Sequence, residues 1–109
     1  MTPAQPRSGE KKILQEDCAE DNLKNGILTL TNQRIIFEET EGTLATLSKK
    51  TGNVVLDVSL DKISSVRTEG FLIKKVVMGV GNKVYKFGVF STNKWSREIE
   101  NQIKLNKTG

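Results

Sequence analysis

One stretch of alternating apolar and polar residues, from residue 26 to residue 37, constrains the fold of this chain more than any other feature. Leu28 and Leu30 fall on one face of an extended strand and the residues between them fall on the other, as expected for a strand with one buried face. Asn32 is predicted to make the turn, because asparagine tolerates left-handed backbone and can bond to the backbone two residues on. Residues 34 to 37 then resume an apolar strand, so the stretch predicts a β-hairpin.

Two further regions carry strand patterns. Residues 11 to 19 are predicted to form the first strand, and apolar residues alternate with polar ones from Val54 to Leu60. Ile63 and Val66 continue the apolar face at a spacing of three residues instead of two. This spacing indicates a bend or a bulge rather than an uninterrupted strand.

A second hairpin is predicted near the end of the chain. Its strands are residues 76 to 80 and 83 to 90, joined across Gly81 and Asn82. Glycine supplies the positive φ that a two-residue turn needs. Tyr85 and Phe87 lie on the inner face of the second strand with Val89 and are expected in the core.

The only predicted helix runs from Thr92, with Ser91 or Thr92 as N-cap, to about residue 106. Trp95, Ile99 and Ile103 recur every four residues among charged side chains, which is typical of an amphipathic helix. Short sheets leave apolar edges uncovered, and this stripe can cover them. We therefore expect a mainly β fold of about seven antiparallel strands, closed by one C-terminal α-helix.

Length and composition limit the possible classes of function. The 109 residues suffice for a single core, and 17 basic against 13 acidic residues give a net charge of +4. The chain has no histidine and only one cysteine, Cys18, which excludes Cys/His zinc sites, Ser-His-Asp triads and disulfides within one copy. We expect a disordered tail over residues 1–9, a domain over residues 10–106 and a short C-terminal tail over residues 107–109.

The predicted compartment is the cytoplasm. A single cysteine fits a reducing environment, and neither a signal peptide nor an apolar run near eighteen residues is evident. Any contact with a membrane is therefore expected to be peripheral.

The segment G-x-L-x-L-T-N-x-R-I-I-F at residues 26–37 resembles the second and third strands of GRAM domains and of related pleckstrin-homology (PH) domains. The spacing of Leu60, Ile63 and Val66 is similar to the family's L-x-x-I-x-x-V stretch, and Trp95 resembles the tryptophan of the closing PH helix. The resemblance implies a PH-like, partly open β-barrel capped by the helix. It also implies a non-catalytic binding module without cofactor or metal.

PH folds bind phosphoinositides through basic residues in loops at the open end of the barrel. The family's basic signature around the first two strands is absent here, and Glu16, Asp17, Glu20 and Asp21 occupy that neighbourhood. Four carboxylates would repel a phosphorylated inositol, so the resemblance favours a GRAM-like or protein-binding variant.

Two binding functions stay open, and the missing lipid signature favours the first. The first is an adaptor that binds a protein, such as an acidic or ubiquitin-like partner, at a sheet edge or beside the helix. Its candidate residues are the basic side chains Lys74, Lys75, Arg97 and Lys104. Paired carboxylates such as Asp57 with Asp61 and Glu98 with Glu100 are interpreted as solvent-facing charge, not acid/base catalysts, and the core positions of Tyr85 and Phe87 disfavour nucleic-acid binding.

The alternative is peripheral binding to anionic phospholipid or phosphoinositide membranes. It uses the basic loop over residues 42–52, with Lys83 expected at the same end of the barrel. Apolar side chains beside lysines suit such a contact. The candidates are Leu44, Leu47, Lys49, Lys50 and Lys83.

Overall fold

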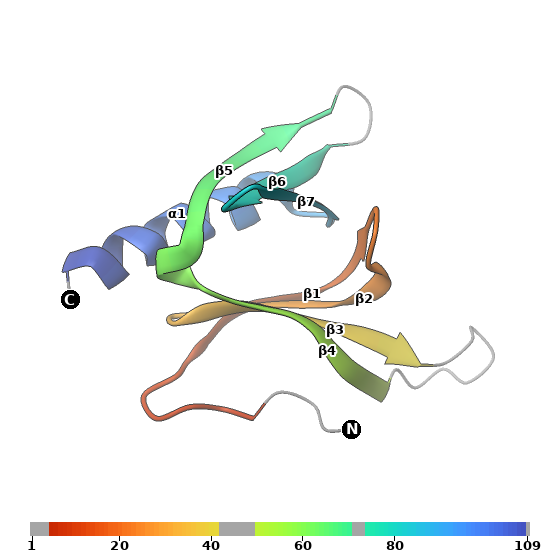
Figure 1. Cartoon of the computed structure of the whole chain (residues 1–109), viewed down its shortest axis with the longest axis horizontal. Coiled ribbons are helices and arrows are strands. Elements are labelled where there is room, and N and C mark those ends of the chain that lie inside the picture. The colour runs from red at the N-terminus through yellow and green to blue at the C-terminus, as the bar shows by residue number, and fades with distance from the viewer. Residues whose placement is uncertain (1–4, 42–49, 71–73, 109) are drawn as a thin grey trace.

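The protein is described here by a computed structural model that covers residues 5–41, 50–70 and 74–108. Seven strands are followed by one helix, and a single 3-10 turn (η2) separates β4 from β5 (Figure 1). In chain order the elements are β1 (Lys12–Glu20), β2 (Lys24–Thr31), β3 (Arg34–Glu41), β4 (Lys50–Ser59), η2 (Leu60–Lys62), β5 (Ile63–Glu69), β6 (Lys75–Val80), β7 (Lys83–Gly88) and α1 (Thr92–Thr108).

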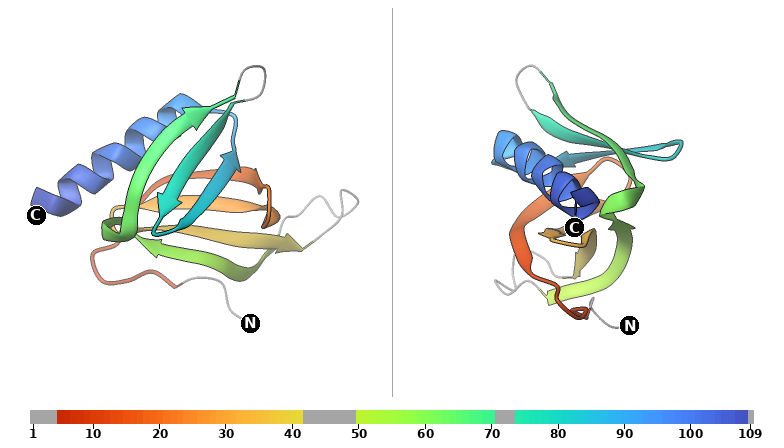
Figure 2. Two further views of the ribbon diagram at one scale, coloured as in Figure 1. Left: turned by 45° about the horizontal axis from the view of Figure 1, so that its top comes forward. Right: turned by 90° about the vertical axis from the view of Figure 1, so that its left-hand side faces the viewer.

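All strand pairs are antiparallel, and the strand order is β4-β3-β2-β1-β7-β6-β5. Figure 2 shows β5, β6 and β7 crossing over the layer made by β1 to β4, with α1 alongside. The two layers are joined by only two residue pairs, Ala19 with Gly88 and Glu20 with Phe87. Because β4 and β5 are the two ends of the sheet, the barrel is open between them. This confirms the predicted mainly β, partly open architecture with its closing helix.

The hairpin of β2 and β3 forms where the sequence predicts it, and Leu28 pairs with Phe37. Its turn is held differently from the expectation. The hydroxyl of Thr31 accepts hydrogen bonds from the backbone N–H groups of Gln33 and Arg34, both at 3.0 Å. Thr31 rather than the predicted Asn32 therefore bonds to the backbone of the turn, since serine and threonine hydroxyls can make the same local bonds.

The side chain of Asn32 connects this turn to the chain ahead of β1. Its Oδ1 accepts from the backbone N–H of Lys11 at 2.8 Å, and its Nδ2 donates to the carbonyl of Gly9 at 3.1 Å. Lys24 is the only residue other than glycine with a positive φ among those described, so the predicted left-handed conformation is not found at Asn32.

A buried arginine anchors the N-terminal segment to the sheet. The guanidinium of Arg34 donates to both carboxylate oxygens of Glu10 at 2.7 and 3.0 Å, to Asp57 at 2.7 Å and to the carbonyl of Gln5 at 2.8 Å. The side chains of Arg34 and Glu10 are each only 5% exposed. A buried guanidinium needs hydrogen-bond acceptors, and of residues 5–9, which the sequence assigns to a disordered tail, Gln5 supplies one of them.

The core lies between the two layers and under the first half of the helix. Trp95 is 1% exposed and Ile99 is fully buried, and both pack against the apolar faces of the strands. The predicted role of Trp95 as a core anchor is confirmed. The helix begins after Ser91, whose carbonyl accepts from the N–H of Trp95 at 3.0 Å, and continues to Thr108. Lys107, which the sequence placed in the C-terminal tail, is therefore helical.

Candidate binding groove

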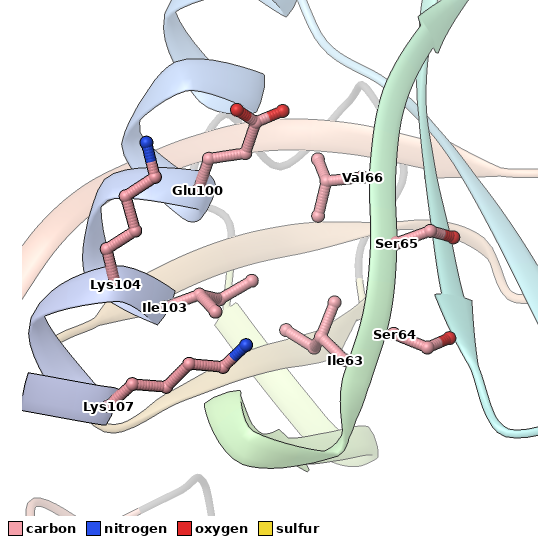
Figure 3. A pocket seen from close by; sticks show the side chains of 8 residues that line it. All are labelled: Ile63, Ser64, Ser65, Val66, Glu100, Ile103, Lys104 and Lys107. Atoms are coloured by element: carbon pink, nitrogen blue, oxygen red, sulfur yellow. The ribbon is translucent and has the colours of Figure 1, made fainter.

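A groove of about 270 Å³ lies between β5 and the second half of α1 (Figure 3). It is lined by Ile63, Ser64, Ser65, Val66, Glu100, Ile103, Lys104 and Lys107. A volume of this size is below the usual range of small-molecule and cofactor pockets, about 300–1,000 Å³. The groove therefore suits a few side chains of another chain better than a cofactor.

Three apolar side chains form the floor of the groove. Ile63 and Val66 project from β5 towards the helix, and Ile103 projects from α1 towards the strand (Figure 3). Ile63 and Val66 share a face although they lie three residues apart, because the register of β5 with β6 shifts between Ile63 and Ser65. Such a bulge inserts one extra residue into a strand, which confirms the reading of the spacing of three.

The bulge is fixed by contacts with β6. The hydroxyl of Ser64 donates to the carbonyl of Gly79 at 3.0 Å. A Cβ atom at Gly79 would lie 2.5 Å from the hydroxyl of Ser65, so a side chain opposite the bulge would force this hydroxyl to move. Both serine side chains point away from the helix (Figure 3).

The rim of the groove carries charges of both signs in a fixed order. Glu100 lies beside Val66 at one end of the groove. The ammonium of Lys107 reaches towards the space beside Ile63, at the opposite end (Figure 3). Lys104 rises along the side of the helix that faces away from β5. Glu100 and Lys107 make no ion pair within the described residues, so both charges are available to a ligand.

The strand that borders the groove is an edge of the sheet. β5 pairs with β6 on one side, and no other described strand pairs with it. An edge strand presents backbone donors and acceptors that another extended chain can use. The groove thus combines an apolar floor, a charged rim and a free strand edge.

The predicted protein-binding residues do not form one cluster. Lys104 lines the groove, and Arg97 is exposed nearer the start of α1 and does not line it. Lys75 begins β6 and pairs with Asp21 at 2.7 Å, and hydrogen bonding to Lys75 lowers the pKa of Asp21. Lys74 is exposed just ahead of β6. Of these four residues, only Lys104 lines the groove. The roles of all four in binding stay predictions.

The predicted lipid-binding residues are described only in part. Leu44, Leu47 and Lys49 lie outside the described residues, as does the side chain of Lys50 at the start of β4. Lys83 is exposed at the start of β7. The lipid site therefore stays a prediction.

One acidic residue near the missing lipid signature has a structural function. Glu20 is buried at the corner where β1 meets β7, and its carboxylate accepts from the backbone N–H groups of Asn22, Leu23 and Lys86 at 2.7–3.0 Å. It holds the turn between β1 and β2 against β7. The sequence could not show this function, because its third donor lies 66 residues away.

A second acidic residue joins β1 to the start of the helix. The carboxylate of Glu16 accepts from the backbone N–H of Phe90 and from the indole N–H of Trp95, the latter at 3.4 Å. Glu16 thus fixes the corner that leads from β7 into α1.

The described residues contain neither a metal-ligand cluster nor a reactive thiol site. No group of three or more carboxylate, cysteine or histidine side chains among them could hold a metal ion. Cys18 is buried, and desolvation raises the pKa of its thiol to about 12, which makes the thiolate scarce at neutral pH. No helix in the described part of the chain is long and apolar enough to cross a bilayer.

Comparison with known proteins finds similar solved structures but no matching family model or curated protein. No protein-family model matches the sequence, and no curated protein matches it. Among solved structures, the Vps36 N-terminal PH domain matches with a TM-score of 0.70 and 19% identity, over 96% of this chain and 87% of that one. The PH domain from TgAPH matches with a TM-score of 0.56 and 19% identity, over 82% and 81%.

The two matches agree with the architecture derived above, in which seven antiparallel strands precede a C-terminal helix. They do not distinguish the GRAM variant, which stays a prediction. The resemblance that the sequence carried is confirmed at the level of the fold, and the chain has the fold of the pleckstrin-homology domains.

Proposed function

We propose that this chain is a non-catalytic protein-interaction module of the cytoplasm. Its binding site is the groove between β5 and α1, and its ligand is an extended segment of a partner protein that carries a carboxylate. The observation that carries the proposal is the groove itself, which lies beside an unpaired strand edge.

Strand addition explains how such a segment can bind without remodelling the domain. Its backbone bonds to the edge of β5, and alternate side chains point towards the helix. An apolar side chain covers Ile63, Val66 and Ile103, and a carboxylate meets the ammonium of Lys107. The core beneath is already complete, because Trp95 and Ile99 are buried in the free chain.

The charges at the opposite corner favour a protein partner over a phosphoinositide. The carboxylate of Glu20 is buried near the β1–β2 turn and is satisfied by three backbone N–H groups. These donors are therefore not available to a phosphate, and the ammonium of Lys75 at this corner is already paired with Asp21 at 2.7 Å.

An NMR titration tests the proposal. The probe is an extended peptide in which an isoleucine is followed, two positions later, by one glutamate, and the control peptide has a glutamine in place of that glutamate. Amide shifts should concentrate on β5 and on the second half of α1, and the glutamine peptide should bind more weakly. Lys107→Glu should weaken binding, whereas Lys94→Glu changes the same charge near the start of the helix, outside the groove, and should not.

Shifts elsewhere, or none, would contradict this site. If anionic vesicles perturb residues 42 to 52 while the peptide leaves β5 unchanged, the membrane alternative replaces it.

A further inference from the structure

From the order of charges in the groove we infer the sequence pattern of the partner segment. The segment runs antiparallel to β5 and presents, from its N-terminus, a basic residue, an apolar residue and an acidic residue at alternate positions. This inference rests on the proposed function, because it concerns the same groove.

The two charges of the groove define its polarity. Glu100 lies at the end marked by Val66, and Lys107 lies at the end marked by Ile63 (Figure 3). Their seven-residue separation on α1 corresponds to about 10 Å along the helix axis. A ligand that bridges the apolar floor therefore meets a carboxylate at one end and an ammonium at the other.

An added strand matches this spacing. Side chains that face the groove recur every two residues, so the first and third of them are about 13 Å apart along the strand. The flexible side chains of lysine and glutamate can span the remaining few ångströms. The middle side chain then lies over Ile63, Val66 and Ile103, where an apolar group loses the most contact with water.

The direction in which the ligand strand runs along β5 decides which of its residues meets which charge of the groove. β5 runs from Ile63 to Val66, and antiparallel pairing is the more common and the more stable per residue. An antiparallel ligand enters at the Val66 end, beside Glu100, and leaves at the Ile63 end, beside Lys107. The basic residue must therefore come first and the acidic residue last.

The acidic residue depends on Lys107 rather than on the helix. The C-terminus of α1 carries a partial negative charge, which disfavours a carboxylate nearby. Lys107 lies in the last turn. Its positive charge attracts a ligand carboxylate and outweighs the repulsion from the helix C-terminus. Replacing it should remove the preference for an acid at this end of the ligand.

Two peptides of equal composition test the inference. The forward peptide carries Lys-Thr-Ile-Thr-Glu between serines, and the reversed peptide carries Glu-Thr-Ile-Thr-Lys. Amide shifts give Kd for each with the parent protein and with the double variant Glu100→Lys, Lys107→Glu. Both replaced residues are exposed, and equal thermal melting of parent and variant shows that the fold is kept.

We expect the forward peptide to bind the parent about tenfold more tightly, because reversal turns two exposed attractive pairs into two repulsive ones; tenfold corresponds to about 1.4 kcal/mol. The double variant should prefer the reversed peptide. Equal binding of both peptides at β5 and α1 would overturn the charge order and leave the proposed function standing. Tighter binding of the reversed peptide to the parent would overturn the antiparallel direction. Shifts from neither peptide at β5 and α1 would overturn both proposals.

Discussion

Replacing Glu10 by glutamine should destabilise the domain at neutral pH and less so in acid. The Glu10 carboxylate accepts two hydrogen bonds from Arg34, one from the Thr31 hydroxyl at 2.8 Å and one from the N–H of Arg7 at 2.9 Å. Glutamine keeps the shape of the side chain but removes its charge. It leaves the buried guanidinium of Arg34 with Asp57 as its only carboxylate partner.

The pKa of Glu10 gives the size and direction of the effect. Hydrogen bonding to Arg34 is the main reason that this pKa is lowered from 4.5 to about 2. Folding is therefore favoured by ionised Glu10 at any pH above 4.5, and this contribution is lost as the pH falls from 4.5 towards 2. At 1.36 kcal/mol per pH unit, the lowering of the Glu10 pKa is worth up to about 3 kcal/mol at pH 7 and about 2 kcal/mol at pH 3.5.

Urea unfolding of both proteins, followed by the fluorescence of Trp95, measures this difference. We expect the free energy of unfolding of the Glu10→Gln variant to approach that of the parent as the pH falls from 7 to 3.5. Glu69→Gln is the matched control, because it removes an exposed ion pair with Arg67 and should have a much smaller effect. A difference between parent and variant that is the same at pH 7 and pH 3.5 would refute the reasoning.

Three further predictions concern packing and the membrane alternative. Trp95→Ala should lower the free energy of unfolding by about 3–5 kcal/mol, the usual cost of emptying a large buried site; a loss below about 1 kcal/mol in thermal melting would mean that the helix does not close the barrel. Gly26→Ala should cost about 1–3 kcal/mol or more in the same assay, because the added methyl group would overlap the Phe37 ring, and unchanged stability would contradict that contact. If the chain binds membranes through residues 42–52, Lys49→Glu with Lys50→Glu should abolish flotation with anionic liposomes and leave the melting temperature unchanged; a parent that never floats at low salt would end this alternative.

Local patterns predicted much of the fold. The alternation around Leu28 and Leu30 was sufficient to place a hairpin, because one buried face imposes a period of two. The spacing of Ile63 and Val66 was sufficient to indicate a bend or a bulge, and the bulge places both side chains in the floor of the groove. The four-residue spacing of Trp95 and Ile99 identified the side of the helix that enters the core.

Contacts between distant residues were not predictable from these patterns. Arg34 reaches Glu10 and Asp57, which are 24 and 23 residues away, and Asp57 had been interpreted as solvent-facing. The groove was anticipated only as a general location beside the helix. Glu100 and Lys107 could be recognised as candidate binding residues only after the sheet order showed that β5 is an edge strand. The periodicity of a sequence does not show which strand lies at an edge.

The place of Trp95 in the chain has a consequence for how the protein is made. The indole and Ile99 complete the core from the last helix, after all seven strands have been synthesised. Until residues 92–108 leave the ribosome, the strands lack the element that covers their apolar faces, and an uncovered sheet is prone to pair with other chains. The nascent protein thus passes through a stage in which every strand is present but the domain cannot close, and that stage lasts until residues 92–108 have emerged and the helix has docked.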